Sequence, residues 1–259
     1  MVAQSNGVVY QSAINPDAAD HYHSPEFSIP PIPGAIELDT DALRLERMRR
    51  SVITSARIIS EDIIAEHRRF KAAFLTCTYR PDEEWNPRQI TGLVKNVREY
   101  LRVRGEKMRY VWVLELTKAG RPHYHMVIWL PKGLTLPKPD KRGWWPYGFT
   151  KIEWARNPVG YIAKYTSKGV SLDGLTGIPK GARLNGNGGL SAAGRCERTW
   201  WGCPAWVRAK CAVDDRPARA EGGGYVLRAS GIHLPSPWRM VGHSPGWRLV
   251  WLAPALSIG

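Results

Sequence analysis

Short apolar segments alternate with amphipathic ones between residues 71 and 170. The run FLTCTY at 74–79 combines aromatic, β-branched and small residues, which predicts a buried strand. A helical pattern follows, with Asn86 and Pro87 as N-cap and first helical position and Gly105 able to close the C-terminus. The apolar positions of this predicted helix recur at helical spacing and indicate packing on a sheet: Ile90, Leu93, Val94, Val97 and Leu101.

Three further strands and a second helix are predicted downstream. MRYVWVLELT at 108–117 and HYHMVIWL at 123–130 are apolar on both faces, as in central strands of a covered sheet, and the linker KAGRP predicts a hairpin. The strand YGFTKIEW at 147–154 precedes Asn157 and Pro158, which repeat the N-cap signature and open a helix. The order strand, helix, three strands, helix predicts an α+β sandwich, with helices on one face of a mainly antiparallel sheet.

The flanking regions differ from this pattern, so four segments are expected. Residues 1–38 are rich in proline and predict a flexible arm, and residues 39–70 predict a basic helical segment. The central domain is expected to span residues 71–175. Residues 176–259 form a basic region rich in glycine and tryptophan.

Local signals refine the two flanking regions. The N-terminal helix is expected to begin at Thr40, with a second start at Ser60. Its arginine-bearing face is either a solvated surface or a phosphate contact, and carries Arg44, Arg47, Arg50 and Arg57. In the C-terminal region, residues 175–195 contain too much glycine for regular elements, whereas 223–230 and 246–254 are candidate strands.

The charge balance narrows the choice of partner. Lys and Arg number 37 against 23 Asp and Glu, and the net charge of +14 predicts a polyanionic partner, which can be DNA, RNA or an anionic membrane surface. No run of about 18 apolar residues and no signal-peptide pattern occurs, so a cytoplasmic protein without a membrane partner is expected. Four cysteines in 259 residues predict reduced thiols, and their spacing disfavours a structural zinc site.

The motif H-Y-H places two imidazoles on one face of a strand. His123 and His125 alternate with Tyr124, so their Cβ atoms lie roughly 7 Å apart on the same side. If Thr117 pairs with His123 in the hairpin, Glu115 lies opposite His125. A carboxylate among apolar residues needs a cation, so a divalent site for Mg²⁺ or Mn²⁺, with Zn²⁺ also compatible, is favoured over two histidines satisfied by hydrogen bonds.

The predicted helix after Pro158 carries candidate nucleophiles. Tyr161 and Tyr165 are four residues apart and share a face, with Lys164 and Lys168 on an adjoining stripe. A phenol has a pKa of about 10, so its attack on a phosphate needs nearby cations, which the metal and Lys164 would supply. The alternative is a pair of half-buried helix tyrosines without a chemical role.

Taken together, three segments resemble the HUH endonucleases, specifically the rolling-circle replication initiators of filamentous phages, microviruses and related plasmids. FLTCTY is similar to their first motif, RPHYHMVIW to their His-hydrophobe-His motif, and YIAKYTSK to their Y-x-x-x-Y motif with its lysine. The stretch PKGARLNGNGGL also resembles filamentous-phage initiators. This resemblance implies an HUH/Rep fold, ferredoxin-like or RRM-like in its strand and helix order, with a five-stranded sheet.

The resemblance also implies a function and a set of site residues. Such initiators nick one strand of single-stranded or supercoiled origin DNA, form a 5′-phosphotyrosine link, leave a 3′ hydroxyl for a host polymerase and later rejoin the strand. By resemblance, the metal ligands are His123 and His125, with Glu115 as third ligand. The sequence shows no helicase segment, so a host helicase is expected to unwind the DNA. The catalytic residues are Tyr161, Tyr165 and Lys164, and the expected DNA contacts are Arg121, Lys168, Lys180 and Arg183.

Other readings share parts of these observations. An HUH transposase would use the same chemistry for strand transfer. A DNA-binding regulator or packaging factor would keep the scaffold without cutting. A zinc hydrolase based on His123 and His125 leaves the tyrosine helix and the net charge unexplained.

Overall fold

The computed structural model describes residues 36–117, 119–168, 178–179, 182–241 and 247–251. The chain divides into two units, and each is considered separately. One comprises residues 41–235 and the other joins residues 1–40 with 236–259. The sites discussed below lie in the first unit.

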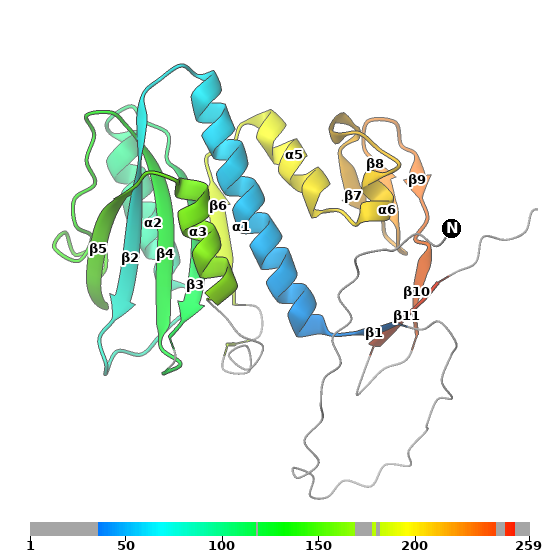
Figure 1. The fold of residues 1–259 in the computed structure, drawn as a ribbon, viewed down its shortest axis with the longest axis horizontal. Helices are drawn as coiled ribbons and strands as arrows, with labels where there is room; N and C mark the ends of the chain where they lie inside the picture. The colour runs from blue at the N-terminus through cyan, green and yellow to red at the C-terminus, as the bar shows by residue number, and fades with distance from the viewer. Residues whose placement is uncertain (1–35, 118, 169–177, 180–181, 242–246, 252–259) are drawn as a thin grey trace, which may run out of the picture. The chain divides into compact units, whose positions relative to one another are not determined.

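A five-stranded antiparallel sheet forms the centre of the first unit (Figure 1). Its strands follow the order β5-β2-β4-β3-β6, so the two longest strands, β2 and β4, pair in the middle. This confirms the predicted α+β class and its antiparallel sheet. The strand bounds are β2 (Phe70–Tyr79), β3 (Arg109–Leu116), β4 (Pro122–Pro131), β5 (Gly148–Ala155) and β6 (Asn185–Gly188).

The edge strand β6 lies where the sequence predicted an irregular segment, so that expectation was wrong. Gly186 and Gly188 pair with Trp112 and Tyr110 of β3, and a Cβ at either glycine would overlap the facing aromatic ring. The two rings lie over the glycine backbone. Glycine weakens a strand by itself, but here it makes room for large side chains of the neighbouring strand.

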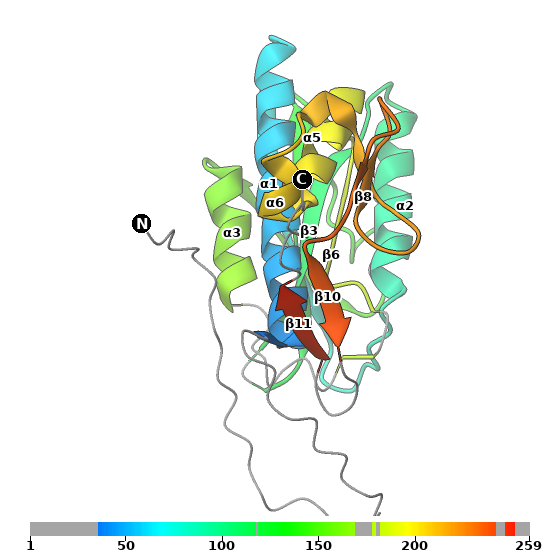
Figure 2. The same cartoon turned by 90° about the vertical axis from the view of Figure 1, so that its right-hand side faces the viewer.

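Helices cover both faces of the sheet, not one. Figure 2 shows α1 and α3 on one side of it and α2 on the other. This agrees with strands that are apolar on both faces. The helices are α1 (Thr40–Ala65), α2 (Gln89–Arg102) and α3 (Pro158–Lys168).

Four of the predicted helix starts can be compared with the structure. Helix α1 begins at Thr40 as expected, but it runs through Ser60, where a second start was predicted. The buried face of α1 continues across this point, and the Ser60 hydroxyl donates to the Ala56 carbonyl. Asn86 caps a turn before α2, whose first residue is Gln89, whereas Asn157 caps α3 and accepts from the Gly160 amide at 2.9 Å.

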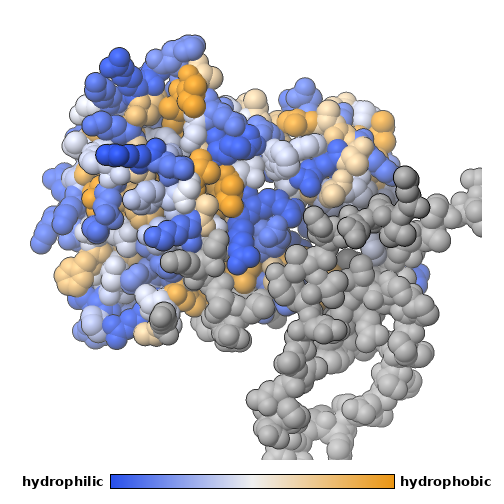
Figure 3. All heavy atoms as spheres, in the orientation of Figure 1, coloured by the Kyte–Doolittle hydropathy of each residue, from blue (hydrophilic) through white to orange (hydrophobic). Residues whose placement is uncertain are grey.

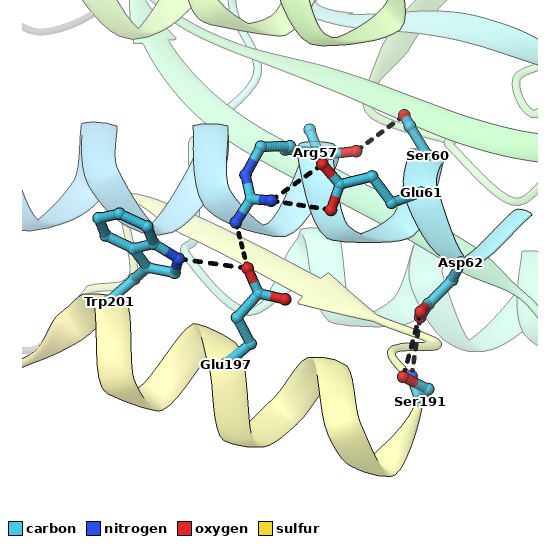
Figure 4. Close-up of polar contacts among 8 residues, drawn as sticks. Arg57, Ser60, Glu61, Asp62, Ser191, Glu197 and Trp201 are labelled. Atoms are coloured by element: carbon cyan, nitrogen blue, oxygen red, sulfur yellow. Dashed lines mark hydrogen bonds and ion pairs between the residues drawn. The ribbon is translucent and has the colours of Figure 1, made fainter. Parts of the chain in front are cut away.

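The C-terminal part of the first unit contains more regular structure than predicted. Its elements are α5 (Ala192–Gly202), α6 (Ala205–Arg208), the 3-10 turn η1 (Val213–Asp215), β7 (Pro217–Arg219), β8 (Tyr225–Leu227) and β9 (His233–Leu234). Helix α5 is held against α1 by polar contacts (Figure 4). Glu197 accepts from Arg57 and Trp201, and Asp62 accepts from the hydroxyl and the amide of Ser191.

In the second unit, three short strands form an antiparallel sheet of order β1-β11-β10. They are β1 (Ile36–Leu38), β10 (Trp238–Val241) and β11 (Trp247–Trp251). Strands β8 and β11 confirm the two late strands predicted from the sequence. Among the helices of the described residues, none is long and apolar enough to cross a membrane.

Gly148 is expected to be essential for the pairing of β5 with β2. It lies opposite Tyr79, and a Cβ there would overlap the Thr78 carbonyl oxygen. We expect Gly148→Ala to lower the free energy of unfolding by about 1–3 kcal/mol, the usual range for forced overpacking. Chemical denaturation measures this change.

Gly92 offers the matched control. It is exposed within α2, and a Cβ there would meet no atom within 4 Å. Gly92→Ala should therefore raise the unfolding free energy by up to about 1 kcal/mol, since alanine favours a helix. Equal effects at the two positions would contradict the predicted clash at β5.

Candidate metal and tyrosine site

The hairpin of β3 and β4 brings one carboxylate and two imidazoles together on one face of the sheet. Glu115 pairs directly with His123, and Val113 pairs with His125. The predicted register, with Glu115 opposite His125, was therefore wrong by two residues. Because the side-chain period of a strand is two, this slip leaves Glu115 on the same face. Its carboxylate reaches diagonally to His125, with 2.5 Å between Oε2 and Nε2.

The three side chains form a compact donor set. Their potential ligand atoms, one from each of Glu115, His123 and His125, all lie within 4.8 Å of one another. Two imidazole nitrogens and one carboxylate oxygen suit a divalent ion such as Mn²⁺, Mg²⁺ or Zn²⁺. The group therefore fits a metal ion, and the donor chemistry alone does not select which one.

The surroundings of the two histidines differ. His125 is 4 % exposed, and its Nδ1 lies 3.2 Å from the Thr76 hydroxyl of β2, which holds the ring in place. His123 is half-buried, and burial, followed by the neighbouring His125, lowers its pKa. A neutral imidazole is the form that binds a metal. The lowered pKa thus favours the neutral form of His123, which can bind a metal.

The residue between the histidines faces the opposite side of the sheet. Tyr124 is fully buried, and its hydroxyl accepts from the Trp85 indole nitrogen at 3.0 Å. Burial raises the pKa of Tyr124 to about 12. This side chain fixes β4 in the core and is not part of the candidate metal site.

Helix α3 lies over β3 and β4 (Figure 1), and ring contacts place its two tyrosines against this face of the sheet. The Tyr165 ring stacks on His125, with centroids 3.8 Å apart and an interplanar angle of 24°. Phe74 of β2 contacts both phenols, at 5.3 Å from Tyr161 and 5.2 Å from Tyr165. The two tyrosines, the phenylalanine and the histidine form one aromatic cluster.

The two phenols have different environments. Tyr165 is partly buried, and burial, with the charge of Glu115 as the next cause, raises its pKa. A bound cation would counter both effects, because it stabilises a phenolate. Tyr161 is 42 % exposed, one turn away, and Lys164 lies 5.8 Å from the Tyr165 ring centroid. The Lys164 side chain is exposed.

Strand β5 extends this face toward solvent. Phe149 and Lys151 pair with Thr78 and Thr76 of β2, which in turn pair with His123 and His125. Phe149 is 65 % exposed, an unusual environment for a large apolar side chain. Sequence reasoning missed Phe149 and Thr76, because their place on this face depends on how β2 pairs with β4 and β5.

Of the four predicted DNA contacts, the structure describes the side chains of two. Arg121 is exposed in the β3–β4 loop, and Arg183 is exposed just before β6. The side chain of Lys168 and the whole of Lys180 lie outside the described residues. Neither Arg121 nor Arg183 belongs to the metal and tyrosine cluster described above.

Comparison with protein-family models matches residues 72–170 to a family described as Replication-associated protein, of the ORF2 type. The matched part runs from β2 to the end of α3, so it contains the donor set and the tyrosine helix. The match supports a replication initiator family, for which DNA is a plausible partner. Searches of curated proteins and of solved structures gave no match.

Proposed function

We propose that this protein is a rolling-circle replication initiator of the HUH endonuclease type, which nicks one strand of origin DNA with a tyrosine and later rejoins it. The observation that carries the proposal is the stacking of the Tyr165 ring on His125, with ring centroids 3.8 Å apart. His125 belongs to the donor set that fits a divalent ion. A phenol beside a phosphate-binding cation is the arrangement that tyrosine attack on a phosphodiester needs. The family match of residues 72–170 supports the same role.

In the proposed step, the phenol oxygen of Tyr161 or Tyr165 attacks the phosphorus of the scissile bond. The bond from phosphorus to O3′ breaks, its electron pair remains on O3′, and that oxygen takes a proton from solvent. The phenol proton is released to solvent, so the products are a 5′-phosphotyrosine and a free 3′ hydroxyl. An Mg²⁺ or Mn²⁺ ion, when bound, supplies the charge that polarises the phosphate.

The protein groups have separate proposed roles. Glu115, His123 and His125 would hold the cation, and Thr76 orients the His125 ring. Lys164 would neutralise charge that develops on the phosphate. The phosphotyrosine bond keeps the energy of the broken link, so rejoining needs no nucleotide cofactor, while a host helicase and a host polymerase would unwind and extend the DNA.

The test of this proposal is covalent capture. Purified protein is incubated with candidate origin strands and Mn²⁺, with and without a chelator, and any DNA-linked peptide is mapped by mass spectrometry. We expect a metal-dependent adduct on a peptide within residues 158–168. An adduct elsewhere would displace the tyrosines from the mechanism, and DNA binding without any adduct would favour a non-cleaving regulator.

Phe149 is expected to stack on a base next to the scissile phosphate. It is exposed and lies on the same face as the histidines, and base stacking on an aromatic ring is worth about 1–3 kcal/mol. We therefore expect Phe149→Ala to weaken single-strand binding about tenfold in an anisotropy titration. The control is Trp154→Ala, because Trp154 is 48 % exposed on the same strand but pairs with Ala73 on the opposite face. An equal loss in both variants would contradict a stacking role.

A further inference from the structure

A second basic region lies outside the metal and tyrosine site. Helix α1, helix α5 and the β7–β8 segment surround a cavity of about 960 Å³, at the upper end of the range of about 300–1,000 Å³ for ligand pockets. Figure 3 shows hydrophilic residues spread over much of the visible face in the orientation of Figure 1. Among the described residues that line the cavity, Asp214 is the single acid, and the arginines are Arg47, Arg50, Arg195, Arg198, Arg216, Arg219 and Arg228. We call this region the arginine cleft.

Most of the positive charge in the arginine cleft has no acidic partner. Arg50 pairs with Glu46, whereas the other six arginines form no ion pair with a described residue. Seven arginines thus line one cavity, with Asp214 as the lining acid and Glu46 paired with Arg50. Such a concentration of like charge is unfavourable by itself and attracts an anionic ligand.

Arg198 shows how the cleft is built. This side chain is half-buried, and it donates to two hydroxyls of α1, Ser55 at 3.1 Å and Ser51 at 3.0 Å. Burial lowers the pKa of Arg198, so its charge is held in place at a cost in solvation. Neutral hydroxyls orient the guanidinium without cancelling its charge.

Arg216 lines the cleft from the end of the 3-10 turn η1, where the backbone is left-handed. Its φ is 50°, in the left-handed region that favours glycine or asparagine. Its side chain is exposed and lines the cleft. An arginine at this position strains the backbone at the end of η1 and adds one positive charge to the lining of the cleft.

Helix α1 separates the arginine cleft from the tyrosine helix. Arg49 of α1 donates to the Thr166 carbonyl of α3 at 3.0 Å. Arg47 and Arg50 of the same helix line the cleft. A helix with its side chains is about 10–12 Å across. The two sites are therefore neighbours on opposite flanks of one helix.

We propose that the arginine cleft binds the sugar-phosphate backbone of single-stranded DNA, as a site separate from the one that cuts. The planar guanidinium matches phosphate oxygens in a fork geometry, and arginines from three segments can follow successive phosphates. A single strand is flexible enough to enter a cavity, whereas a stiff duplex could contact only its rim. The choice of DNA as the polyanion rests on the proposed function, but no covalent step is required.

The test compares two triple variants of the full-length protein in a chelator, so that no metal-dependent cleavage occurs. The cleft variant is Arg195→Gln, Arg219→Gln and Arg228→Gln, and all three residues are exposed. The control removes the same charge from the far face of the sheet, on and next to α2, with Arg88→Gln, Lys95→Gln and Arg98→Gln. Binding of a labelled single strand is measured by fluorescence anisotropy at several salt concentrations.

We expect the cleft variant to raise Kd at least about tenfold and the control to change it less than about threefold. Each lost phosphate contact lowers the slope of log K against log salt by about 0.7 for single strands, so the cleft variant should lose about 2. Equal Kd values and slopes for the two variants overturn the proposal. Displacement of the strand by polyglutamate at equal charge also overturns it and assigns the cleft to an acidic protein.

A single variant separates binding from folding. Arg216→Gly removes one cleft charge and also relieves the left-handed strain, so the melting temperature should stay equal or rise while Kd for the strand increases severalfold. Unchanged Kd would overturn the role of Arg216 in the cleft. The outcome is independent of the nicking proposal, because wild-type protein that forms no adduct with any strand would still give a full binding comparison.

Discussion

Replacing both Tyr161 and Tyr165 with phenylalanine is expected to abolish the covalent adduct between protein and DNA. Each change removes one phenol oxygen and keeps the ring, so Phe74 and His125 retain their stacking partners. Loss of a nucleophile lowers the rate of a covalent step by about 10⁴-fold or more. The double variant should therefore bind single strands like wild type but yield no adduct on a denaturing gel.

The single variants should affect different steps. The two phenols are one helical turn apart, about 6 Å along the axis, so only one can lie at the scissile phosphate at a time. We expect one variant to lose first-strand cleavage and the other to lose the closing transfer. Tyr147→Phe is the control, since Tyr147 belongs to the aromatic cluster around Trp145, outside the site. Adduct that survives in the double variant would exclude both tyrosines as nucleophiles.

The candidate site could be inferred from sequence because each of its parts depends on a short-range period. Strand alternation places His123 and His125 on one face, and the predicted hairpin adds Glu115 to it. The error of two residues in the hairpin register did not alter that face. Helical spacing in the same way places Tyr161 and Tyr165 together. Which face of the sheet the helix covers is a tertiary property, and sequence reasoning reached it only through the resemblance to a known family.

The elements that sequence reasoning missed are stabilised by contacts distant in the chain. Strand β6 is rich in glycine, and it forms because Trp112 and Tyr110 of β3 lie over its backbone. Helix α5 contains Gly194, whose small size admits Ile58 of α1 at this contact. Glycine lowers the intrinsic strand propensity of β6 and the helix propensity of α5, so tertiary packing determines that both elements form. The arginine cleft was missed for the same reason, because its residues come from three separate segments.

The second large effect is expected on removal of the metal or of one of its ligands. We expect His123→Ala, or addition of a chelator to wild type, to lower the cleavage rate at least about 100-fold, since the cation supplies several kcal/mol of charge stabilisation. His123 is only half-buried, so its loss should disturb folding less than that of His125. His233→Ala is the control, because this exposed histidine lies outside the donor set.

Metal binding itself provides a readout that does not depend on cleavage. An ion at about 100 times its Kd stabilises the folded state by about 2.7 kcal/mol, so Mn²⁺ should raise the melting temperature of wild type by several degrees. That shift should disappear in His123→Ala and remain in His233→Ala. Glu115→Gln tests the third ligand, because glutamine keeps the size and can still contact His125 but lacks the carboxylate charge. A full Mn²⁺ shift in Glu115→Gln would mean that two histidines hold the ion and that the carboxylate only orients His125.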